Sequence, residues 1–178
     1  ALNTTINLSI ADATSDYVFK TTQPKALFKE VKSNFAAHKE NDYIDFDYEG
    51  LISKMLSQEG PSLAVGDING DGNEDVFIGG AKGQSGKIYL NKGNNNFAVT
   101  AQKALDTDAN FEDTAASFFD ADSDGDLDLL VGSGGNERTS PDNYQNRLYL
   151  NNGKGIFVKS TNVIPSTSTN VSVIAPYD

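Results

Sequence analysis

The stretch DINGDGNED at residues 67–75 decides the fold class of this chain, because a second copy, DADSDGDLD, follows at residues 120–128. The similarity extends to both flanks. SLAVGDINGDGNEDVFIG at residues 62–79 aligns without a gap to AASFFDADSDGDLDLLVG at residues 115–132, at a constant offset of 53 residues. Repetition over this length predicts an architecture built from equivalent units.

The repeat continues with KIYLNKGNNNF at residues 87–97 and RLYLNNGKGIF at residues 147–157, now offset by 60 residues. The seven extra residues of the second copy fall within residues 134–146. Each copy alternates about four short apolar or aromatic strands with turns rich in Gly, Asn and Asp. Short, evenly spaced strands with aromatic residues and glycines at fixed places are typical of propeller blades. We therefore predict an all-β fold made of such blades.

The two full copies span residues 59–111 and 112–165, and residues 171–178 resemble the start of a third copy. Asp178 stands 58 residues after Asp120, at the first position of the acidic loop. The alternative is a chance apolar tail that ends in Asp. A third copy that stops so early predicts a partial propeller cut from a longer array. Uncapped repeats leave apolar faces and strand edges open, so the chain is expected to pair with something, with self-association as one possibility. The strand expected at residues 171–175 should be disordered, fold back onto the last blade or pair with another chain.

The part of the chain before the repeats gives weaker signals. Residues 1–26 are rich in Thr, Ser, Ala and Asp, which predicts a linker or the end of a preceding domain, followed by a repeat region at residues 27–178. We expect strands at residues 5–10 and 27–35, and one or two helical turns at residues 51–57.

Composition excludes several classes of protein. The 178 residues include 14 Lys and Arg against 25 Asp and Glu, a net charge of −11, which argues against a nucleic-acid partner because phosphate contacts need clustered cations. No run of residues is long and apolar enough to cross a membrane, and no signal-peptide pattern opens the chain, so no membrane insertion is expected. The chain has no cysteine, which rules out disulfides and thiolate metal sites.

The two acidic loops carry the chemistry that the sequence predicts. Oxygen-bearing side chains stand at positions 1, 3, 5 and 9 of each nine-residue loop, and the glycine at position 6 allows a sharp turn that presents the carbonyl of position 7. Donor sets made only of oxygen suit Ca²⁺ better than Mg²⁺, which requires a strict octahedron. The candidate ligands are Asp67, Asn69, Asp71, Asn73 (by its carbonyl) and Asp75 in the first loop, and Asp120, Asp122, Asp124, Asp126 (by its carbonyl) and Asp128 in the second.

The alternative is that both loops are ordinary polar turns, since Asp, Asn and Gly dominate turns. Four acidic groups at the ligand positions of the second loop would then repel one another with nothing to offset the cost. The second loop has one more carboxylate among these positions than the first, where Asn69 is neutral, so we expect it to bind calcium more tightly. Neither loop is an EF-hand, because position 12 is Ile78 or Val131 inside an apolar run instead of a bidentate Glu before a helix.

Three features of the sequence resemble FG-GAP or VCBS repeats of integrin-α-type β-propellers. They are the acidic loop between two short strands, the Gly-Gly after the second strand of the first copy, and the Tyr-Leu-Asn-x-Gly-x-x-x-Phe pattern beyond it. The segments at residues 38–43, 57–61 and 79–83, with Glu112 and Asp113, are more narrowly similar to bacterial surface proteins, largely of Bacteroidetes, that carry such repeats beside ASPIC/UnbV segments. The resemblance covers residues 28–178.

This resemblance implies a calcium-stabilised propeller, usually of seven blades, at the cell surface, associated with the outer membrane, or secreted. Such a module is expected to serve in adhesion or in binding an extracellular glycan or protein. The same ten loop residues are the metal ligands that it implies.

The sequence offers few groups of residues that could act together in catalysis, so we expect a binding module and no enzyme. His38 is the single histidine, and Glu59 and Glu112 occupy equivalent positions eight residues before each loop, which favours a structural role over a glycosidase pair. The alternative function is a part of a propeller-type extracellular hydrolase or lyase whose catalytic residues lie outside this chain.

The insertion at residues 136–145 breaks the repeat and is the expected place for ligand contacts, through Asn136, Glu137, Arg138 and Tyr144. A longer solvated loop is the alternative there.

Overall fold

The structure is a computed structural model that describes residues 1–178 except 1, 2, 4, 6, 8, 15–25, 29, 59, 138–143, 167, 168 and 178. The chain divides into two units, Ala1–Lys32 and Ser33–Asp178. In the described part of the first unit, a short 3₁₀ helix, η1 (Ile10–Asp12), follows Ser9, whose Oγ accepts a hydrogen bond from the N–H of Ala11 (3.2 Å). The strand expected at residues 5–10 is wrong for the described residues, because Ile10 opens this helix.

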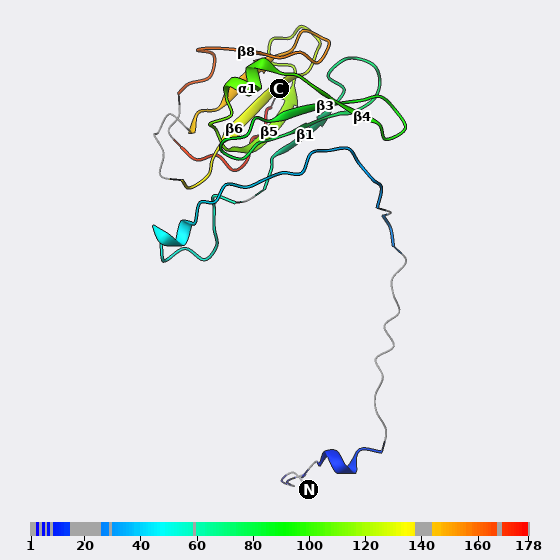
Figure 1. The fold of residues 1–178 in the computed structure, drawn as a ribbon, viewed down its shortest axis with the longest axis vertical. Helices are drawn as coiled ribbons and strands as arrows, with labels where there is room; N and C mark the ends of the chain where they lie inside the picture. Colours follow the sequence, from blue (N-terminus) through cyan, green and yellow to red (C-terminus); the bar gives the residue numbers. More distant parts are fainter. Residues whose placement is uncertain are drawn as a thin grey trace. The chain divides into compact units, whose positions relative to one another are not determined.

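The second unit contains two antiparallel sheets of four strands each (Figure 1). The first sheet has the order β1 (Leu63–Gly66), β2 (Asp75–Ile78), β3 (Lys87–Asn91) and β4 (Phe97–Thr100). The second has the order β5 (Asp113–Phe119), β6 (Asp128–Ser133), β7 (Arg147–Leu150) and β8 (Val158–Lys159). Each sheet is a simple meander and coincides with one sequence repeat. The all-β prediction and the four strands per copy are confirmed.

Turn chemistry sets the strand boundaries. Gly72 and Gly125 have φ angles of 85° and 94°, the left-handed region that a side chain disfavours, which explains the glycine at position 6 of each acidic loop. Asn94 and Asn95 also have positive φ, in the tight connection between β3 and β4. Asparagine tolerates this conformation better than most residues, so the Asn run there ends one strand and starts the next.

Two helical elements of this unit lie where the sequence did not indicate them. The α-helix α1 (Lys103–Thr107) connects the sheets and buries Leu105 in the core, and the 3₁₀ helix η2 (Asp45–Asp47) precedes the first strand. The helical turns expected at residues 51–57 are wrong. Instead, the fully buried Asp45 Oδ2 accepts hydrogen bonds from Leu56 N (2.9 Å), Ser57 N (3.1 Å) and Ser57 Oγ (2.8 Å), which hold that segment as an irregular loop.

The strand expected at residues 27–35 is also wrong for the residues that the structure describes there. Within the second unit, the end of this segment is fixed by aromatic packing and not by a strand ladder. The ring of Phe35 lies edge-on to Tyr89 (4.9 Å between centroids) and tilted against Phe97 (4.8 Å). The N–H of Ala36 donates to the Tyr89 hydroxyl (3.0 Å).

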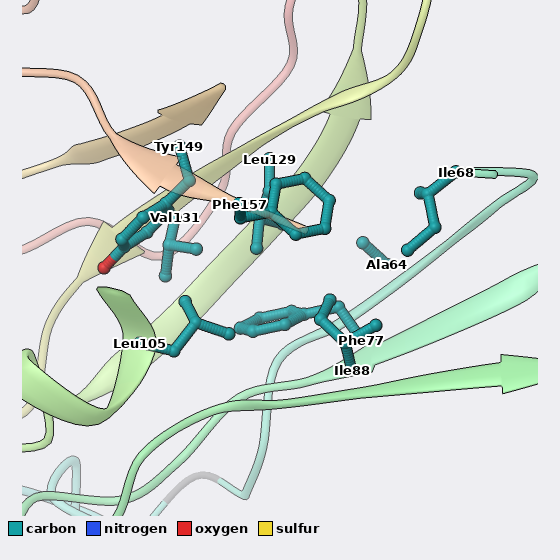
Figure 2. Close-up of a cluster of buried hydrophobic side chains, with 9 residues drawn as sticks. All are labelled: Ala64, Ile68, Phe77, Ile88, Leu105, Leu129, Val131, Tyr149 and Phe157. Carbon is teal, nitrogen blue, oxygen red and sulfur yellow. The ribbon is translucent and has the colours of Figure 1, made fainter. Parts of the chain in front are cut away.

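The main core lies between the two sheets (Figure 2). The first sheet contributes Ala64, Phe77 and Ile88, and the second contributes Leu129, Val131 and Tyr149, joined by Ile68, Leu105 and Phe157. The repeat offsets show that the two sheets contribute opposite faces to the core between them. Leu129 corresponds to Val76 of the first sheet, not to the buried Phe77. The back of one sheet therefore packs on the front of the next, and both sheets point the same way along the stack.

The equivalent front face of the first sheet is open to solvent over much of its area. One row of cross-strand partners, Val65, Val76, Tyr89 and Val99, runs across all four strands. Its counterpart, Phe118, Leu129, Tyr149 and Lys159, faces the first sheet in the core. In the first row, Val65 is 48% and Val99 60% exposed, whereas Tyr89 is covered.

The described residues after β8 form no strand, and no helix of the described chain is long and apolar enough to span a membrane. Val171 nevertheless returns to the second sheet, where its N–H donates to the carbonyl of Ser133 (3.1 Å). Gly132 lies so close to the side chains of Val171 and Ile174 that a Cβ there would come within 2.8 Å of each. The described part of segment 171–178, which the sequence indicated as the start of a third copy, thus folds back on the second sheet. Asp178 lies outside the described residues.

Candidate metal loops

The first acidic loop joins β1 to β2 and folds around the carboxylate of its first residue. Asp67 accepts hydrogen bonds from the N–H groups of Asp71 (3.1 Å) and Gly72 (2.8 Å). Asn69 Oδ1 accepts a second bond from the N–H of Asp71 (3.0 Å), and Asp71 Oδ1 accepts from the N–H of Asn73 (2.9 Å). These short-range bonds contribute to the curvature of the loop.

The second loop joins β5 to β6 and repeats this geometry. Asp120 accepts from the N–H groups of Asp124 (3.2 Å) and Gly125 (3.0 Å), and Asp124 accepts from the N–H of Asp126 (3.0 Å). Asp120, Asp122 and Asp124 are exposed, and each offers a carboxylate oxygen within 4.8 Å of the others. The structure therefore brings three of the predicted ligands of this loop together.

Asp75 and Asp128, at position 9 of each loop, are almost completely buried and anchor the loop to its sheet. The Asp75 carboxylate accepts from Ile68 N (3.2 Å) and Asn91 N (2.7 Å). The Asp128 carboxylate accepts in the same way from Ala121 N (2.9 Å) and Asn151 N (2.8 Å). An ionised carboxylate has about four acceptor sites, so these bonds leave room for a metal contact. Position 9 thus has a structural role that the ligand pattern alone does not reveal.

Sequence reasoning missed the asparagines that follow the Tyr-Leu pair. Asn91 Nδ2 donates to the carbonyl of Glu74 (3.1 Å), and Asn151 Nδ2 donates to the carbonyl of Leu127 (3.0 Å), which fixes the end of each loop against the third strand. Asn151 Nδ2 also lies within hydrogen-bond distance of the carbonyl of Ile68 in the first loop (2.7 Å). This side chain ties the two loops together. The only available signal was its recurrence after Tyr-Leu in both copies.

Electrostatics differ between the two loops. Partial desolvation, followed by the charges of Asp124 and Asp128, raises the pKa of Asp122 and of Asp126. In the first loop, the N–H of Asn73 lowers the pKa of Asp71. Desolvation, with smaller contributions from the charges of Asp71 and Asp67, raises the pKa of Asp75. Repulsion between carboxylates therefore acts in both loops, where a bound cation would relieve it.

The second loop fits a hard divalent cation. Two oxygens bound to one ion at about 2.4 Å lie no more than about 4.8 Å apart, and the carboxylates of Asp120, Asp122 and Asp124 meet this limit. The donor set contains no nitrogen or sulfur, which disfavours Zn²⁺ and copper. In the first loop, the amide of Asn69 replaces the middle carboxylate, so that site has a lower negative charge.

The other residues singled out from the sequence divide into three groups. Glu59 and Arg138 lie outside the described residues. Glu137 is 6% exposed and accepts a hydrogen bond from Asn41 Nδ2, and Tyr144 donates to the Glu137 carbonyl (3.3 Å), so this end of the insertion is tied to the fold. Glu112 is buried at the start of β5 and accepts from the N–H of Lys82 (2.6 Å).

Meandering sheets of four strands, with an acidic loop between the first and second strands, define a β-sheet repeat protein. Residues 62–131 match the family model described as FG-GAP-like repeat. The matched stretch contains all of β1 to β5, most of β6 and both acidic loops. This part of the chain is therefore similar to FG-GAP-like repeats, and the match supports the FG-GAP family that the sequence pattern indicated.

Proposed function

We propose that this chain is a calcium-binding part of an integrin-like β-propeller that acts outside the cytoplasm as an adhesion or ligand-binding module. The observation that carries the proposal is the cluster of Asp120, Asp122 and Asp124, which recurs in sequence and in hydrogen bonding as Asp67, Asn69 and Asp71. Two loops of the same geometry, at the same place in two sheets, are better explained by a shared ligand than by chance turns.

The proposed ligands are the ten residues at positions 1, 3, 5, 7 and 9 of the two loops, with Asn73 and Asp126 acting through their carbonyls. When bound, calcium would neutralise the repulsion in each loop. The chain's own residues then hold the loop to its sheet, through the Asp75 and Asp128 carboxylates.

The propeller assignment is supported by the direction of packing. The two sheets stack back to front, an arrangement in which every further sheet can repeat the same contact, and such heterologous contacts close into rings when the rotation permits. The open front face of the first sheet and the return of Val171 to the second sheet are consistent with neighbours on both sides.

A binding role, with no catalytic step, is proposed because the catalytic candidates have structural partners. His38 Nε2 lies 3.0 Å from Glu40 Oε1, and the adjoining cavity measures only about 30 Å³. The extracellular bacterial location and the association with ASPIC/UnbV segments rest on the resemblance of the sequence. Calcium loops fit that location because extracellular modules can use weak sites, with dissociation constants of about 10⁻⁴–10⁻³ M.

Thermal unfolding of the complete 178-residue chain tests the proposal. Saturation at 100 times the dissociation constant adds about 2.7 kcal/mol to the free energy of unfolding, so calcium should raise the melting temperature and a chelator should lower it. Asp124→Asn should reduce the calcium-dependent shift, whereas Asp42→Asn, which removes the same charge from an exposed residue outside the loops, should leave it unchanged. A melting temperature that is indifferent to calcium would refute the metal sites.

A further inference from the structure

A cavity of about 420 Å³ opens beside β7, between the end of the insertion and the segment that follows β8. Cavities of about 300–1,000 Å³ are the usual size for small-molecule sites. Part of its wall is apolar, formed by Phe111, Leu148 and Ile164. It lies away from both acidic loops, and the calcium sites do not account for it.

Most of the remaining wall consists of groups that both donate and accept hydrogen bonds. The amides of Gln145, Asn146 and Asn162 and the hydroxyls of Ser160, Thr161 and Ser166 belong to the lining residues. Among the described residues, none that lines the cavity carries a carboxylate, although the chain has a net charge of −11. Amides and hydroxyls arranged around an apolar patch match a ligand that carries many hydroxyl groups.

The two cations in the wall already have partners. Arg147 Nη2 donates to Asp113 (2.5 Å) and Nη1 to the Tyr149 hydroxyl (3.2 Å), while Lys159 donates to Asp108 (2.8 Å). Their charges are therefore balanced, and a ligand needs no negative charge. Both cations lie over the ring of Phe111, at 4.3 Å and 5.4 Å from its centroid, and so fix the aromatic part of the wall.

Two polar atoms of lining residues are buried and have no hydrogen-bond partner, the Arg147 Nε donor and the Asn146 Oδ1 acceptor. Arg147 is 4% exposed, so its position is set by the fold. A buried polar group without a partner is costly, because its lost hydration is not replaced by a hydrogen bond. A ligand hydroxyl recovers part of that cost where the Asn146 amide turns toward the cavity, because a hydroxyl can accept and donate at once.

Most residues that line the cavity belong to the second copy, while Phe111 ends the first copy. Gln145 and Asn146 end the connection between β6 and β7, which is seven residues longer than its counterpart in the first copy, and the counterpart of Lys159 in the first copy is Val99. Residues that differ between the two copies and line the same cavity are more readily explained by a bound ligand than by the packing of the sheets.

We propose that this cavity binds a saccharide, through its amide and hydroxyl groups and with Phe111 as the apolar contact. This inference rests on the proposed role as a ligand-binding module and names its ligand class and its site.

Saturation-transfer NMR on the calcium-loaded 178-residue chain tests the site. The probes are glucose, galactose, mannose, N-acetylglucosamine, lactose and cellobiose at millimolar concentration, with sodium acetate as the anionic probe. At least one sugar should receive saturation. Asn146→Ala and Asn162→Gly should weaken its binding roughly three- to tenfold, the loss of one neutral hydrogen bond. Asn162 has a φ of 64°, so glycine removes its amide without strain.

Asn95→Gly is the matched control, because Asn95 also has a positive φ but lies in the first copy, and it should leave sugar binding unchanged. Failure of every sugar, binding of acetate alone, or equal binding by Asn146→Ala, Asn162→Gly and the parent chain would each overturn the proposal. Calcium-dependent melting, measured on the same samples, separates the outcomes. A chain that responds to calcium but binds no sugar refutes the saccharide site and leaves the metal sites intact.

Discussion

Val171 makes the same main-chain contact with the second sheet that Asp113 makes with the first. The Asp113 N–H donates to the carbonyl of Gly80 (3.0 Å), and the Val171 N–H donates to the carbonyl of Ser133 (3.1 Å), its equivalent 53 residues later. The two donors are 58 residues apart, the same interval that separates Asp120 from Asp178. The main-chain contact that starts the second sheet on the first is thus repeated by Val171 on the second sheet. The third copy at residues 171–178 stays a prediction.

The first prediction is self-association through the open face of the first sheet. Val65 and Val99 lie on a face whose counterpart in the second sheet is covered, so two chains can bury apolar surface by stacking back to front. Light scattering should give an apparent mass above that of a monomer, rising with protein concentration. The double variant Val65→Lys with Val99→Lys should shift the mass toward the monomer, whereas Leu51→Lys, at an isolated exposed position, should not. A parent chain that is monomeric at every concentration would contradict this interface.

The second prediction ranks the two metal loops. Asp124→Ala removes a charged group from the cluster with three close carboxylates, while Asn69→Ala removes a neutral amide from the other loop. We expect Asp124→Ala to lose more calcium affinity, by tenfold or more for about 1.4 kcal/mol of lost interaction. Isothermal titration of both variants measures this, and the reverse order would mean that loop charge does not set affinity.

The third prediction separates metal binding from loop anchoring. Asp128→Ala leaves the half-buried N–H groups of Ala121 and Asn151 without their acceptor, at about 1 kcal/mol each, so it should lower stability even with a chelator present. Asp124 is exposed and accepts only a local bond, so Asp124→Ala should destabilise the chain mainly when calcium is available. Denaturant unfolding with and without calcium distinguishes them. If both variants lost the same unfolding free energy with calcium and with chelator, the distinction between an anchoring Asp128 and a metal-binding Asp124 would be wrong.

Local patterns explain what the sequence predicted well. The strands and acidic loops are specified within a few residues by alternation, by turn residues such as Gly72, and by bonds between side chains and the adjacent main chain. The predicted ligand cluster at Asp120, Asp122 and Asp124 depends on a single nine-residue loop. Short-range geometry of this kind can be predicted from one sequence.

The features that escaped prediction depend on distant partners. Helix α1 is only five residues long and is held by the burial of Leu105 between the sheets, which no local pattern indicates. Segment 51–57 has helical spacing, but the buried Asp45 carboxylate competes for its main-chain N–H groups. The bond from Asn151 to the first loop spans 83 residues of sequence. Contacts of this range follow from the stacking direction, which the sequence did not specify.

The fourth prediction compares two tyrosines at equivalent positions of the repeat. The Tyr149 hydroxyl donates to Asp108 (2.6 Å) and accepts from Arg147 (3.2 Å), and all three side chains are buried. The Tyr89 hydroxyl accepts from the N–H of Ala36 (3.0 Å). Tyr149→Phe should lower the free energy of unfolding by about 1–3 kcal/mol and Tyr89→Phe by about 1 kcal/mol. Denaturant unfolding of the two variants checks the order, and a larger loss for Tyr89→Phe would contradict the role of the Tyr149 network.

The last prediction concerns pH and Glu112. Burial, opposed by the N–H of Lys82 and reinforced by Glu137, Glu40 and Asp113, raises the pKa of Glu112 from 4.5 to about 7. A carboxyl group with a raised pKa binds its proton more tightly in the folded chain than in the unfolded chain. Its contribution to stability is therefore complete below about pH 4.5 and is lost as the pH rises through about 7.

Glu112→Gln replaces the ionisable group with a neutral one of similar size that still accepts from Lys82 N. The variant should flatten the decline in stability between pH 5 and pH 8, and its advantage over the parent should grow across that interval to about 1–2 kcal/mol. Glu74→Gln makes the same change at an exposed residue and is the control, so it should leave the slope as in the parent. Chemical unfolding at a series of pH values, with a chelator present to remove any effect of metal, measures the slopes. An unchanged slope in Glu112→Gln would show that this buried carboxyl group does not titrate in that range.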